Sequence, residues 1–588
     1  MATTTTPSAA QTGGGFLLGP TDPASIFTPE DFTAEHREIA RTTEAFFTNE
    51  VAPHVEAIQH QEPGLAQSIL RKSAELGLTA VMIPEAYGGM EMDLVSALIV
   101  AEKISRDASY AGWHGAHTGI GTLPLVLFGT EEQKKRYLPR LATAELIAAY
   151  CLSEPQAGSD AMNIKTRADL SADGTHYILN GQKMWITNGG GADLYTVFAK
   201  VGGEHFTAFL VERAWPGVTP GAEEKKMGIK GSSTAPLYLE NVRVPKENVL
   251  GEVGRGHLIA FNILNLGRLK LGPGSVGGCK NLLAVCLKYA KERTAFGKPI
   301  GEFGMIRHKL AEMAIRTYAA ETMSYRVAGM IDSKLSGFSW SLPDAAELHM
   351  KAVEEFAAEC SYVKVFASEA LSYVADEGVQ IHGGYGYHQD YLVERAYRDS
   401  RINRIFEGTN EINRMLATGM LLKRAQKGRL GLVEAVKKLQ GELLSGGAVQ
   451  DPTEAGLVSA AKNVALFCLG VAYQAFGTEL DQHQEVLASI TDVSMNAFAM
   501  EGCVLRTERL RAAGKGELAG LYTTVFCRSA METIESAARN VLAASSAGDG
   551  LRTNLAILRR LAKFEPVNAI EIRRTIAGRL LDANRYFV

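Results

Sequence analysis

The spacing of hydrophobic positions changes twice along this chain of 588 residues. Over residues 29–148 apolar side chains recur with a period near 3.6, which predicts amphipathic helices. Over 149–256 short alternating runs are separated by Asp-Gly, Asn-Gly, Gly-Gly and Pro-Gly turns, which predicts a compact β domain. Helical periodicity then returns. The expected helices include 35–51, 65–76, 94–105, 282–292, 306–332 and 345–377, and the expected strands are 177–179, 194–200, 207–212 and 235–244.

The order of elements is therefore α, β, α, α, and a prior of about 150 residues per domain also gives three or four domains. The expected segments are a disordered lead at 1–28, a helical domain at 29–148, a β domain at 149–256, a helical domain at 257–424, a linker at 425–452 and an additional helical domain at 453–588. Gly272-Pro273-Gly274 should break or kink its helix, because proline lacks an N–H and clashes with the preceding turn.

Composition narrows the class of protein. Hydrophobic residues make up 46% and charged residues 21%, so we expect disorder to be confined to the ends and a linker. A net charge of −4 gives no reason to expect nucleic acid as a partner. The seven cysteines are scattered without a C-x-x-C pair or a histidine-rich cluster, which favours reduced core residues, a cytoplasmic location and no metal site.

No targeting or membrane-spanning segment is expected. The first fifteen residues lack a basic region, an apolar region and arginine, which disfavours secretory and mitochondrial leaders. The longest strongly apolar run, 464–473, is far short of the ~20 residues that span a bilayer. We therefore expect a soluble protein.

One short segment carries candidate chemistry. Residues 406–414 read F-E-G-T-N-E-I-N-R and place Glu407 beside a glycine, just before a helix that Thr409 and Asn410 can cap. A carboxylate on such a loop could act as a base towards a weakly acidic carbon, or it could simply complement a helix dipole. The segment alone leaves both roles open.

Six blocks in order resemble the FAD-dependent acyl-CoA dehydrogenase family. They are A-Y-C-L-S-E-P-Q-A-G-S-D-A at 149–161, K-M-W-I-T-N-G at 183–189, N-V-R-V-P-K-E-N-V-L-G at 241–251, R-T-A-F-G-K-P-I at 293–300, Q-I-H-G-G-Y-G-Y-H-Q-D-Y-L-V-E-R-A-Y-R-D at 380–399, and F-E-G-T-N at 406–410. The helical region after residue 453 resembles the very-long-chain branch, which carries a second C-terminal helical domain. The resemblance implies an α+β multidomain fold, in which an N-terminal helical domain, a β-barrel-like middle domain and a four-helix bundle precede that additional domain.

The resemblance implies α,β-dehydrogenation of a fatty acyl-CoA to the trans-2-enoyl-CoA, with electrons passed to an electron-transferring flavoprotein. Glu407 would abstract the α-proton and the flavin N5 would accept the β-hydride. The family's second arrangement places a glutamate before an arginine on the first helix after the β domain, but here Gly267 precedes Arg268, which leaves Glu407 as the base. Gly408 would permit close approach of the backbone to substrate. Arg268 would assist the CoA moiety together with Asn265, although an exposed helix arginine is the alternative.

The cofactor implied is FAD. Candidate contacts to the flavin are Tyr150, Cys151, Leu152, Ser153, Gly158, Ser159, Trp185, Ile186, Thr187, Thr409 and Glu411, of which Ser159 would also touch CoA. Trp185 could equally be a core residue of the β domain. Candidate contacts to the adenosine diphosphate half, across a subunit boundary, are Arg293, Phe296, Gln380, Gly383 and Gly384. Arginine suits pyrophosphate because its donors bind in pairs, and the shared cofactor predicts at least a homodimer.

The resemblance places Gly112 and Ala116 at the base of the acyl pocket, where small residues would leave a deep channel for long-chain substrates. Tyr110, Trp113 and His114 lie beside them and could refill it. No arginine occurs in this block to pair with a dicarboxylic acyl end, which disfavours a glutaryl-type decarboxylating enzyme.

Three alternatives stay open. An acyl-CoA oxidase would share the fold but let oxygen reach the reduced flavin. An assembly or scaffold protein could retain the fold without the chemistry. The basic C-terminal helices resemble the region with which very-long-chain relatives rest on a membrane, here its inner face, although alternating basic residues more often form a solvated surface.

Overall fold

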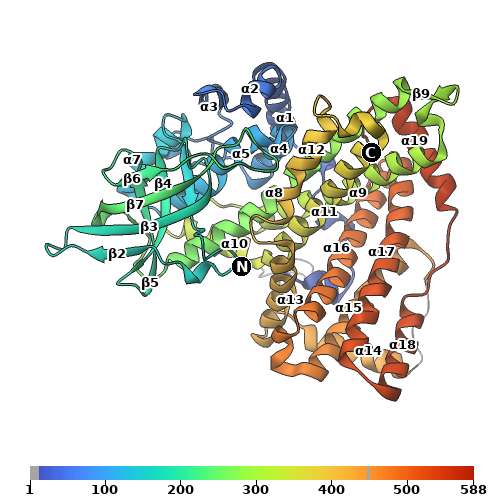
Figure 1. The fold of residues 1–588 in the computed structure, drawn as a ribbon. Helices are drawn as coiled ribbons and strands as arrows, with labels where there is room; N and C mark the ends of the chain where they lie inside the picture. Colours follow the sequence, from blue (N-terminus) through green and yellow to red (C-terminus); the bar gives the residue numbers. More distant parts are fainter. Residues whose placement is uncertain (1–11, 446–450) are drawn as a thin grey trace.

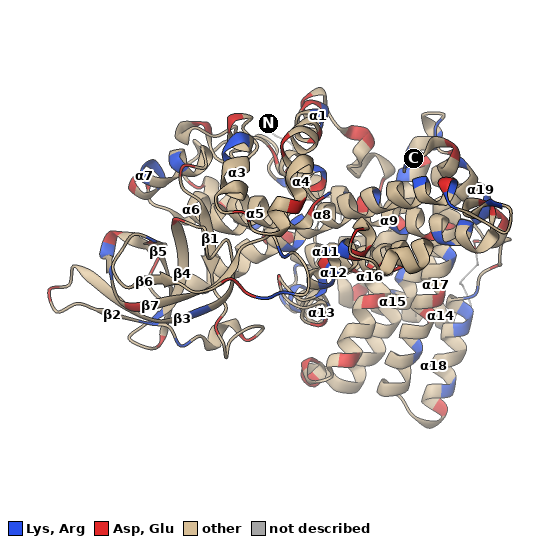
Figure 2. Ribbon diagram, turned by 45° about the horizontal axis from the view of Figure 1, so that its top comes forward, with Lys and Arg blue, Asp and Glu red and all other residues tan. Residues whose placement is uncertain are grey.

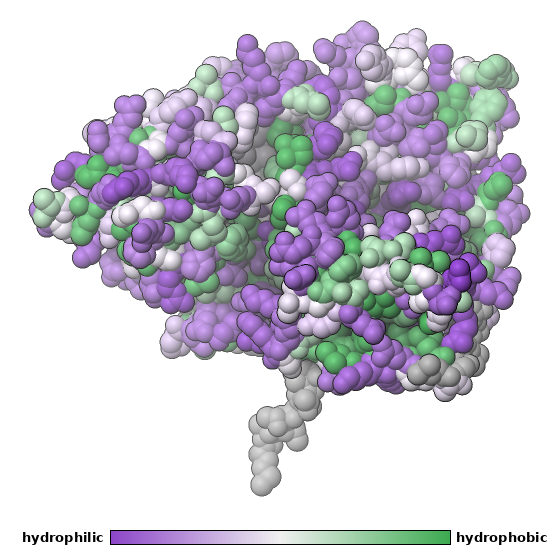
Figure 3. Space-filling model, turned by 60° about the horizontal axis from the view of Figure 1, so that its bottom comes forward, coloured by the Kyte–Doolittle hydropathy of each residue, from purple (hydrophilic) through white to green (hydrophobic). Residues whose placement is uncertain are grey.

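The computed structural model describes residues 12–445 and 451–588. Four parts are visible in Figure 1: the N-terminal helices, a β domain at one end, a central group of long helices, and a C-terminal group of helices beside it. The order along the chain is the predicted α, β, α, α. On the face in Figure 3, hydrophilic residues predominate and hydrophobic ones are scattered among them.

The N-terminal domain contains short helices that begin at well-formed caps. Thr33, Asp93, Asp107 and Thr130 each accept a hydrogen bond from a backbone N–H of the first turn that follows, which satisfies donors that the helix leaves free. The helices are α1 Ala34–Phe46, α2 Val55–Gln59, α3 Leu65–Glu75, α4 Leu94–Ile104, α5 Ala108–Ala116, α6 Leu123–Phe128 and α7 Glu131–Ala142. A single π turn, His117–Gly121, follows α5 directly.

The middle domain is one eight-stranded sheet with the order β6-β7-β3-β2-β4-β5-β8, and β1 pairs in parallel with β4. The long pair β3·β7 is antiparallel, with Tyr177 opposite Val244, and its register shifts between Lys183 and Ile186. The strands are β1 Ala148–Cys151, β2 Arg167–Leu170, β3 His176–Thr187, β4 Leu194–Val201, β5 His205–Glu212, β6 Val218–Pro220, β7 Thr234–Pro245 and β8 Val249–Leu250.

The central helices are longer than predicted, and α11 packs against α8, α9 and α13. They are α8 Gly256–Glu292, α9 Gly304–Lys334, α10 Ala345–Glu355, α11 Ala357–His382, α12 Leu392–Ser400 and α13 Asn410–Gln426. The small strands β9 Thr294–Ala295 and β10 Lys298–Pro299 form a hairpin after α8. The helix expected over 345–377 is interrupted at Phe356, which separates α10 from α11.

The expected break at Gly272-Pro273-Gly274 does not occur, because α8 is helical from Gly256 to Glu292. The glycines serve close packing instead. A Cβ on Gly272 would lie 2.3 Å from Val363 Cγ1, and one on Gly277 would lie 2.0 Å from the carbonyl oxygen of Glu102. Side chains at these positions would push α8 away from α11 and α4, so tertiary contact explains the small residues.

The C-terminal helices pack against the central ones through α9, α13 and α16. They are α14 Leu432–Leu444, α15 Glu454–Phe476, α16 Gln484–Ala512, α17 Glu517–Ser545, α18 Gly548–Leu561 and α19 Ala569–Ala583. The linker expected at 425–452 is wrong for most of its length, since α14 occupies it; residues 446–450 lie outside the described residues. The segment Glu454–Gln482 is apolar and long enough to cross a membrane, yet 61% of its most apolar window is buried inside the protein.

The disordered lead expected at 1–28 is also wrong for residues 12–28. Phe16 and Leu17 are 2% exposed, and the Phe16 ring packs edge-on against Tyr362 and Phe498. Backbone N–H groups of Gly13 and Gly14 donate to Glu355 and Glu359. The segment therefore joins the central helices to α16; residues 1–11 lie outside the described residues.

Candidate active site

Glu407 stands on a loop with an unusual backbone. Its φ is +57°, and Gly408 follows with φ +79°. A left-handed conformation costs a glutamate about 1–3 kcal/mol, so surrounding contacts must hold it in place. Thr409 then caps α13 by accepting a hydrogen bond of 3.2 Å from the N–H of Ile412.

Three buried side chains bind the carbonyl oxygens of this loop. Arg268 of α8 donates to the carbonyl of Glu407 at 3.3 Å, and Lys364 of α11 donates to that of Gly408 at 2.8 Å. Asn413 reaches the carbonyls of Glu407, Gly408 and Thr409 at 3.4, 2.8 and 3.0 Å. The loop is thus fixed by donors from three different helices. Within the described residues, the N–H of Glu407 itself donates to no acceptor.

The Glu407 carboxyl group is buried, and among the described residues its Oε2 has no hydrogen-bond partner. Burial raises its pKa to about 7, although the positive charges of Arg268 and Lys364 oppose that rise. Burial also lowers the pKa of Lys364 to about 8. A carboxyl group is suited to proton transfer when its pKa lies near neutrality and one of its oxygens is free to accept a proton.

The carboxylate lies directly against Gly267 of α8. A Cβ built on Gly267 would be 2.5 Å from Oε2 of Glu407 and 2.9 Å from its Cδ. Any larger residue at 267 would therefore compete with Glu407 for the same space. The sequence has glycine at 267, where the family's second arrangement has a glutamate, and in the structure the Glu407 carboxylate fills the space that a side chain there would need.

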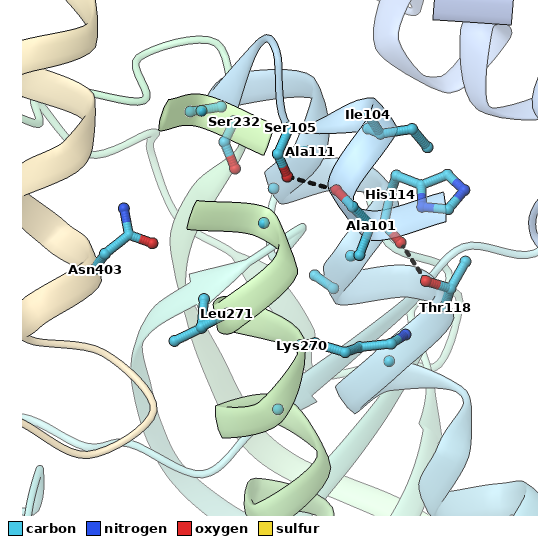
Figure 4. Close-up of a pocket in the computed structure, with 18 of the residues that line it drawn as sticks. Ala101, Ile104, Ser105, Ala111, His114, Thr118, Ser232, Lys270, Leu271 and Asn403 are labelled. Atoms are coloured by element: carbon cyan, nitrogen blue, oxygen red, sulfur yellow. Dashed lines mark hydrogen bonds between the residues drawn. The ribbon is translucent and has the colours of Figure 1, made fainter. Parts of the chain in front are cut away.

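Glu407 lines a mostly apolar cavity of about 250 Å³ between α8 and the helices α4 and α5 (Figure 4). Gly112 and Ala116 line the same cavity, as predicted for the acyl pocket, and so do Gly267 and Thr187. His114 contributes to the wall, but Tyr110 is fully buried outside it and Trp113 donates its indole N–H to Gly231. Of the three residues that could have refilled the channel, only His114 reaches it.

Two sequence blocks meet at the edge of the β domain beside this cavity. The N–H of Met184 donates to the carbonyl of Ser153 at 2.9 Å, and the Lys183 ammonium pairs with Glu154 at 2.7 Å in the interior. The shift of register between β3 and β7 leaves Trp185 at φ +60° and 57% exposed, so it is not a core residue. Its contact with the flavin stays a prediction.

The other residues predicted near the flavin differ in exposure. The side chains of Cys151 and Ile186 are buried in the β domain, and Tyr150 donates its hydroxyl to the carbonyl of Ala260 at 3.3 Å. Leu152 is nearly buried, Ser153 is partly exposed, and Gly158 and Ser159 are exposed. Cys151 and Ile186 can therefore offer only backbone groups to a ligand.

Arg268 is not the exposed helix arginine of the alternative interpretation. It is 5% exposed and also donates to Asn265 at 2.8 Å. Arg268 supports the Glu407 loop directly, and Asn265 contacts Arg268. Their contact with CoA stays a prediction.

A second, open groove of about 670 Å³ lies at the C-terminal end of α11 and contains Arg293, Gly383 and Gly384. A Cβ on either glycine would meet no atom within 4 Å. The Arg293 guanidinium lies 5.5 Å from the centroid of the Tyr385 ring. Gln380 is exposed beside the groove, and Phe296, on the β9–β10 hairpin, is 95% exposed.

Comparisons with known proteins agree with this arrangement. Family models described as acyl-CoA dehydrogenase N-terminal, middle and C-terminal domains match residues 33–145, 149–242 and 254–421, and a further C-terminal domain model matches 460–560. A probable acyl-CoA dehydrogenase of Bacillus subtilis is 48% identical over 98% of this chain and 99% of its own length. This chain belongs to the acyl-CoA dehydrogenase family.

Two further similarities cover the additional domain and the fold. The mitochondrial very long-chain specific acyl-CoA dehydrogenase of Bos taurus is 37% identical over 79% of this chain and 73% of its own. The crystal structure of an acyl-CoA dehydrogenase complexed with FAD from Bacillus anthracis has a TM-score of 0.97 and 49% identity, covering 98% of this chain and all of the other. The predicted fold class, including the additional C-terminal helical domain, is thereby confirmed.

Residues of this dehydrogenase fit a flavin dinucleotide on their own geometry. Trp185 is exposed, the Glu407 N–H has no acceptor among the residues that the structure describes, and the glycines of the groove leave space beside an arginine. Thr409 and Glu411 lie in the first turn of α13, where backbone N–H groups favour polar ligand atoms.

Sequence reasoning missed Lys364 and Asn413. Each lies on a helix face and acts on the Glu407 loop through tertiary contacts. Lys364 had a weak signal, since it is a lone lysine among apolar and small residues of a helix that reads as buried.

Proposed function

We propose that this acyl-CoA dehydrogenase oxidises a fatty acyl-CoA to the trans-2-enoyl-CoA, with Glu407 as the base. The observation that carries the proposal is the buried Glu407 carboxyl group, whose Oε2 has no partner and which lies in the wall of the apolar cavity. The acyl chain would occupy the cavity, and the thioester would lie beside Glu407.

In the first step, the carboxylate must remove a weakly acidic proton from the α-carbon. Raising the pKa of Glu407 to about 7 makes it a stronger base than an ordinary glutamate while leaving about half of it ionised at neutral pH. The backbone N–H of Glu407, which has no acceptor among the described residues, would donate to the thioester oxygen. Negative charge that develops on that oxygen is stabilised by such a donor.

The second hydrogen leaves the β-carbon as a hydride, so the reaction requires an acceptor of two electrons. FAD supplies that acceptor when bound. Trp185 and Thr187, backbone groups of 150–159, and the first turn of α13 would hold the flavin, while Arg293, Gly383 and Gly384 would hold the adenosine diphosphate half. The Glu407 carboxyl group keeps the proton until product leaves.

The separation between the two halves of the cofactor site supports a homodimer. Lys364, beneath the Glu407 loop, and Gly383, in the groove, are 19 residues apart along α11, which is about 28 Å at 1.5 Å per residue. Phe296 exposes almost its whole ring to solvent in one chain. We propose that the groove of one subunit completes the flavin site of its partner and that the hairpin is covered there.

A long acyl chain is the substrate that the cavity favours. The residues of α8 that line it run from Ile263 to Leu282, about 28 Å along the helix axis. Gly115 offers further space, because a Cβ there would meet no atom within 4 Å. Each methylene buried in this channel contributes about 0.8 kcal/mol, so affinity should rise with chain length until the channel is filled.

We propose an electron-transferring flavoprotein as the physiological acceptor, as the resemblance implies, with an acyl-CoA oxidase as the competing function. Purified protein loaded with FAD, mixed without oxygen with palmitoyl-CoA, should yield the trans-2-enoyl product and lose its visible flavin absorbance. Slow recovery of colour in air, and rapid recovery with electron-transferring flavoprotein, is expected of a dehydrogenase. Rapid recovery in air alone would favour the oxidase. A colourless protein that FAD cannot reconstitute would favour the scaffold.

We propose a cytoplasmic location, which the seven free and buried cysteines support. Contact with the inner face of a membrane through the last helices stays a prediction. Arg573, Arg574 and Arg579 form ion pairs with Glu312, Glu571 and Glu517, and basic and acidic residues are interspersed over this region in Figure 2. Flotation with anionic vesicles, compared with neutral ones, would test the contact.

A further inference from the structure

Lys270 brings a positive charge into the wall of the acyl cavity. It lies on α8 one turn beyond Gly267, on the helix face that also presents Gly274 and Gly278 to the cavity. Figure 4 shows its side chain reaching from α8 towards the segment that carries Thr118. Its Nζ lies over Gly119, where a built Cβ would be 3.5 Å away.

No acidic side chain compensates this charge. Within residues 12–445 and 451–588, no carboxylate lies within ion-pair distance of the Lys270 ammonium and no side-chain or backbone oxygen accepts a hydrogen bond from it. Burial lowers the pKa of Lys270 to about 8, with no opposing acidic neighbour. Most of the ammonium is still protonated at pH 7, so an unpaired cation faces a mostly apolar space.

The polar groups around it are neutral. Burial, with a contribution from Lys270, lowers the pKa of His114 to about 3 and that of His117 to about 4. His117 is fully engaged, since its Nε2 contacts the carbonyl of Leu141 and its Nδ1 accepts from the N–H of Ala148. His114, which is 4% exposed and lines the cavity, has no partner for Nε2. Within the described residues, the ammonium of Lys270 and Nε2 of His114, both in residues that line the cavity, thus have no hydrogen-bond partner.

Burying an unpaired charge is costly, and proteins keep such charges where a ligand supplies the counter-ion. A carboxylate matches the ammonium of Lys270, whereas a methyl end does not. The block at 110–118 contains no arginine for this purpose, but α8 supplies a lysine from elsewhere in the sequence.

We propose that Lys270 binds a carboxylate carried by the acyl chain, so that CoA thioesters of dicarboxylic acids are substrates alongside ordinary fatty acyl-CoAs. This inference rests on the proposed function and names a substrate class for the same site. The oxidation is unchanged: Glu407 would take the α-proton, the β-hydrogen would leave as a hydride to the acceptor that bound FAD supplies, and the distal carboxylate would stay intact.

The test compares acyl-CoAs in matched pairs that differ only at the far end: hexanoyl with adipoyl, decanoyl with decanedioyl, and palmitoyl with hexadecanedioyl. For each, kcat/KM is measured with the FAD-loaded wild type and with Lys270→Met, Lys270→Arg and Lys288→Met. Lys288 is an exposed lysine on the same helix and serves as the matched control. FAD content and thermal midpoint establish that each variant is folded.

We expect Lys270→Met to lower kcat/KM for one or more carboxylate-ended substrates by roughly tenfold or more, as for loss of a charge-assisted hydrogen bond. Methyl-ended substrates should be unaffected or improved, Lys270→Arg should retain most of the carboxylate preference, and Lys288→Met should behave as wild type.

Equal effects of Lys270→Met on both members of every pair would overturn the inference. So would a wild type that oxidises the methyl-ended series and none of the carboxylate-ended one, and that result would leave the proposed function intact. Failure of both series with FAD-loaded wild type would overturn the proposed function and this inference together.

Discussion

Gly267 on α8 makes the space in which the Glu407 carboxylate lies: a Cβ at 267 would be 2.5 Å from Oε2. The two positions that can carry the base in this family therefore converge on one point in the structure. A residue with a side chain at 267 and Glu407 in its present conformation exclude each other.

Replacing Gly267 by alanine should displace the Glu407 carboxylate while leaving the fold intact, because the clash involves the end of a flexible side chain. Alanine in place of glycine within a helix also stabilises by about 0.5–1 kcal/mol. Since small misplacement of a reacting group can cost up to about a hundredfold, we expect kcat to fall by roughly tenfold to a hundredfold. Gly419→Ala is the control, because a Cβ at Gly419 in α13 meets no atom within 4 Å. Unchanged kcat in Gly267→Ala would contradict the geometry.

The raised pKa of Glu407 predicts how the free energy of unfolding changes with pH. Its carboxyl group has a pKa of about 7 in the folded protein against 4.5 for an ordinary glutamate, so folding favours the neutral form. The stabilising contribution is present below pH 4.5 and is lost as pH rises through 7, up to about 3 kcal/mol. Glu407→Gln keeps a neutral side chain throughout. The thermal midpoint of the variant should therefore rise relative to that of the wild type as pH increases from 5 to 8.5. A constant difference between the two midpoints would refute the prediction.

Lys364 should position Glu407 and tune its acidity. Its ammonium binds the Gly408 carbonyl and the Asn410 side chain at 2.8 and 2.7 Å, and its charge lowers the pKa of Glu407. In Lys364→Met the pKa of Glu407 should rise, so the ascending limb of the kcat/KM profile should move to higher pH. Activity at pH 7 should fall by about tenfold. Lys351→Met, an exposed lysine of α10, should change neither. A fall in activity without movement of the pH profile would indicate a merely structural role.

Phe296 and Arg293 should affect assembly and cofactor retention rather than the proton transfer itself. Burial of a phenylalanine side chain contributes about 1.5–3 kcal/mol, so Phe296→Ser should weaken dimerisation by roughly tenfold to a hundredfold. Analytical ultracentrifugation at several concentrations measures this, with Leu170→Ser, another exposed apolar residue, as control. Arg293→Gln should raise the dissociation constant of FAD without changing the pH profile of kcat. A Phe296→Ser protein that associates like the wild type would contradict the proposed interface.

The sequence was sufficient for the order of domains and for the residues that belong to short motifs. Glu407, Gly267, Gly112 and Ala116 line one cavity, and Arg268 donates to the Glu407 carbonyl, while their roles stay predictions. Local pattern and turn chemistry determine such features, so they can be read along the chain.

Features that depend on distant contacts could not be predicted. The glycine-rich lead looked disordered, yet Phe16 and Leu17 find a buried site between α11 and α16. Gly272-Pro273-Gly274 looked like a break, but close approach of neighbouring helices overrides helix propensity there. Lys364 and Lys270 carry no motif, because their roles depend on which groups the fold brings beside them.

Abstraction of the α-proton by Glu407 can be tested by following reduction of the flavin. FAD-loaded wild type, Glu407→Gln and Glu359→Gln are mixed with palmitoyl-CoA without oxygen, and the loss of visible flavin absorbance is followed by stopped flow. Glu359 is the matched control, since it is also a buried carboxyl whose pKa is raised to about 7, but it lies outside the cavity.

If Glu407 is the base, bleaching is rapid in the wild type and in Glu359→Gln, and roughly a thousandfold slower in Glu407→Gln with substrate still bound. Bleaching of Glu407→Gln at the wild-type rate would contradict the assignment of the base.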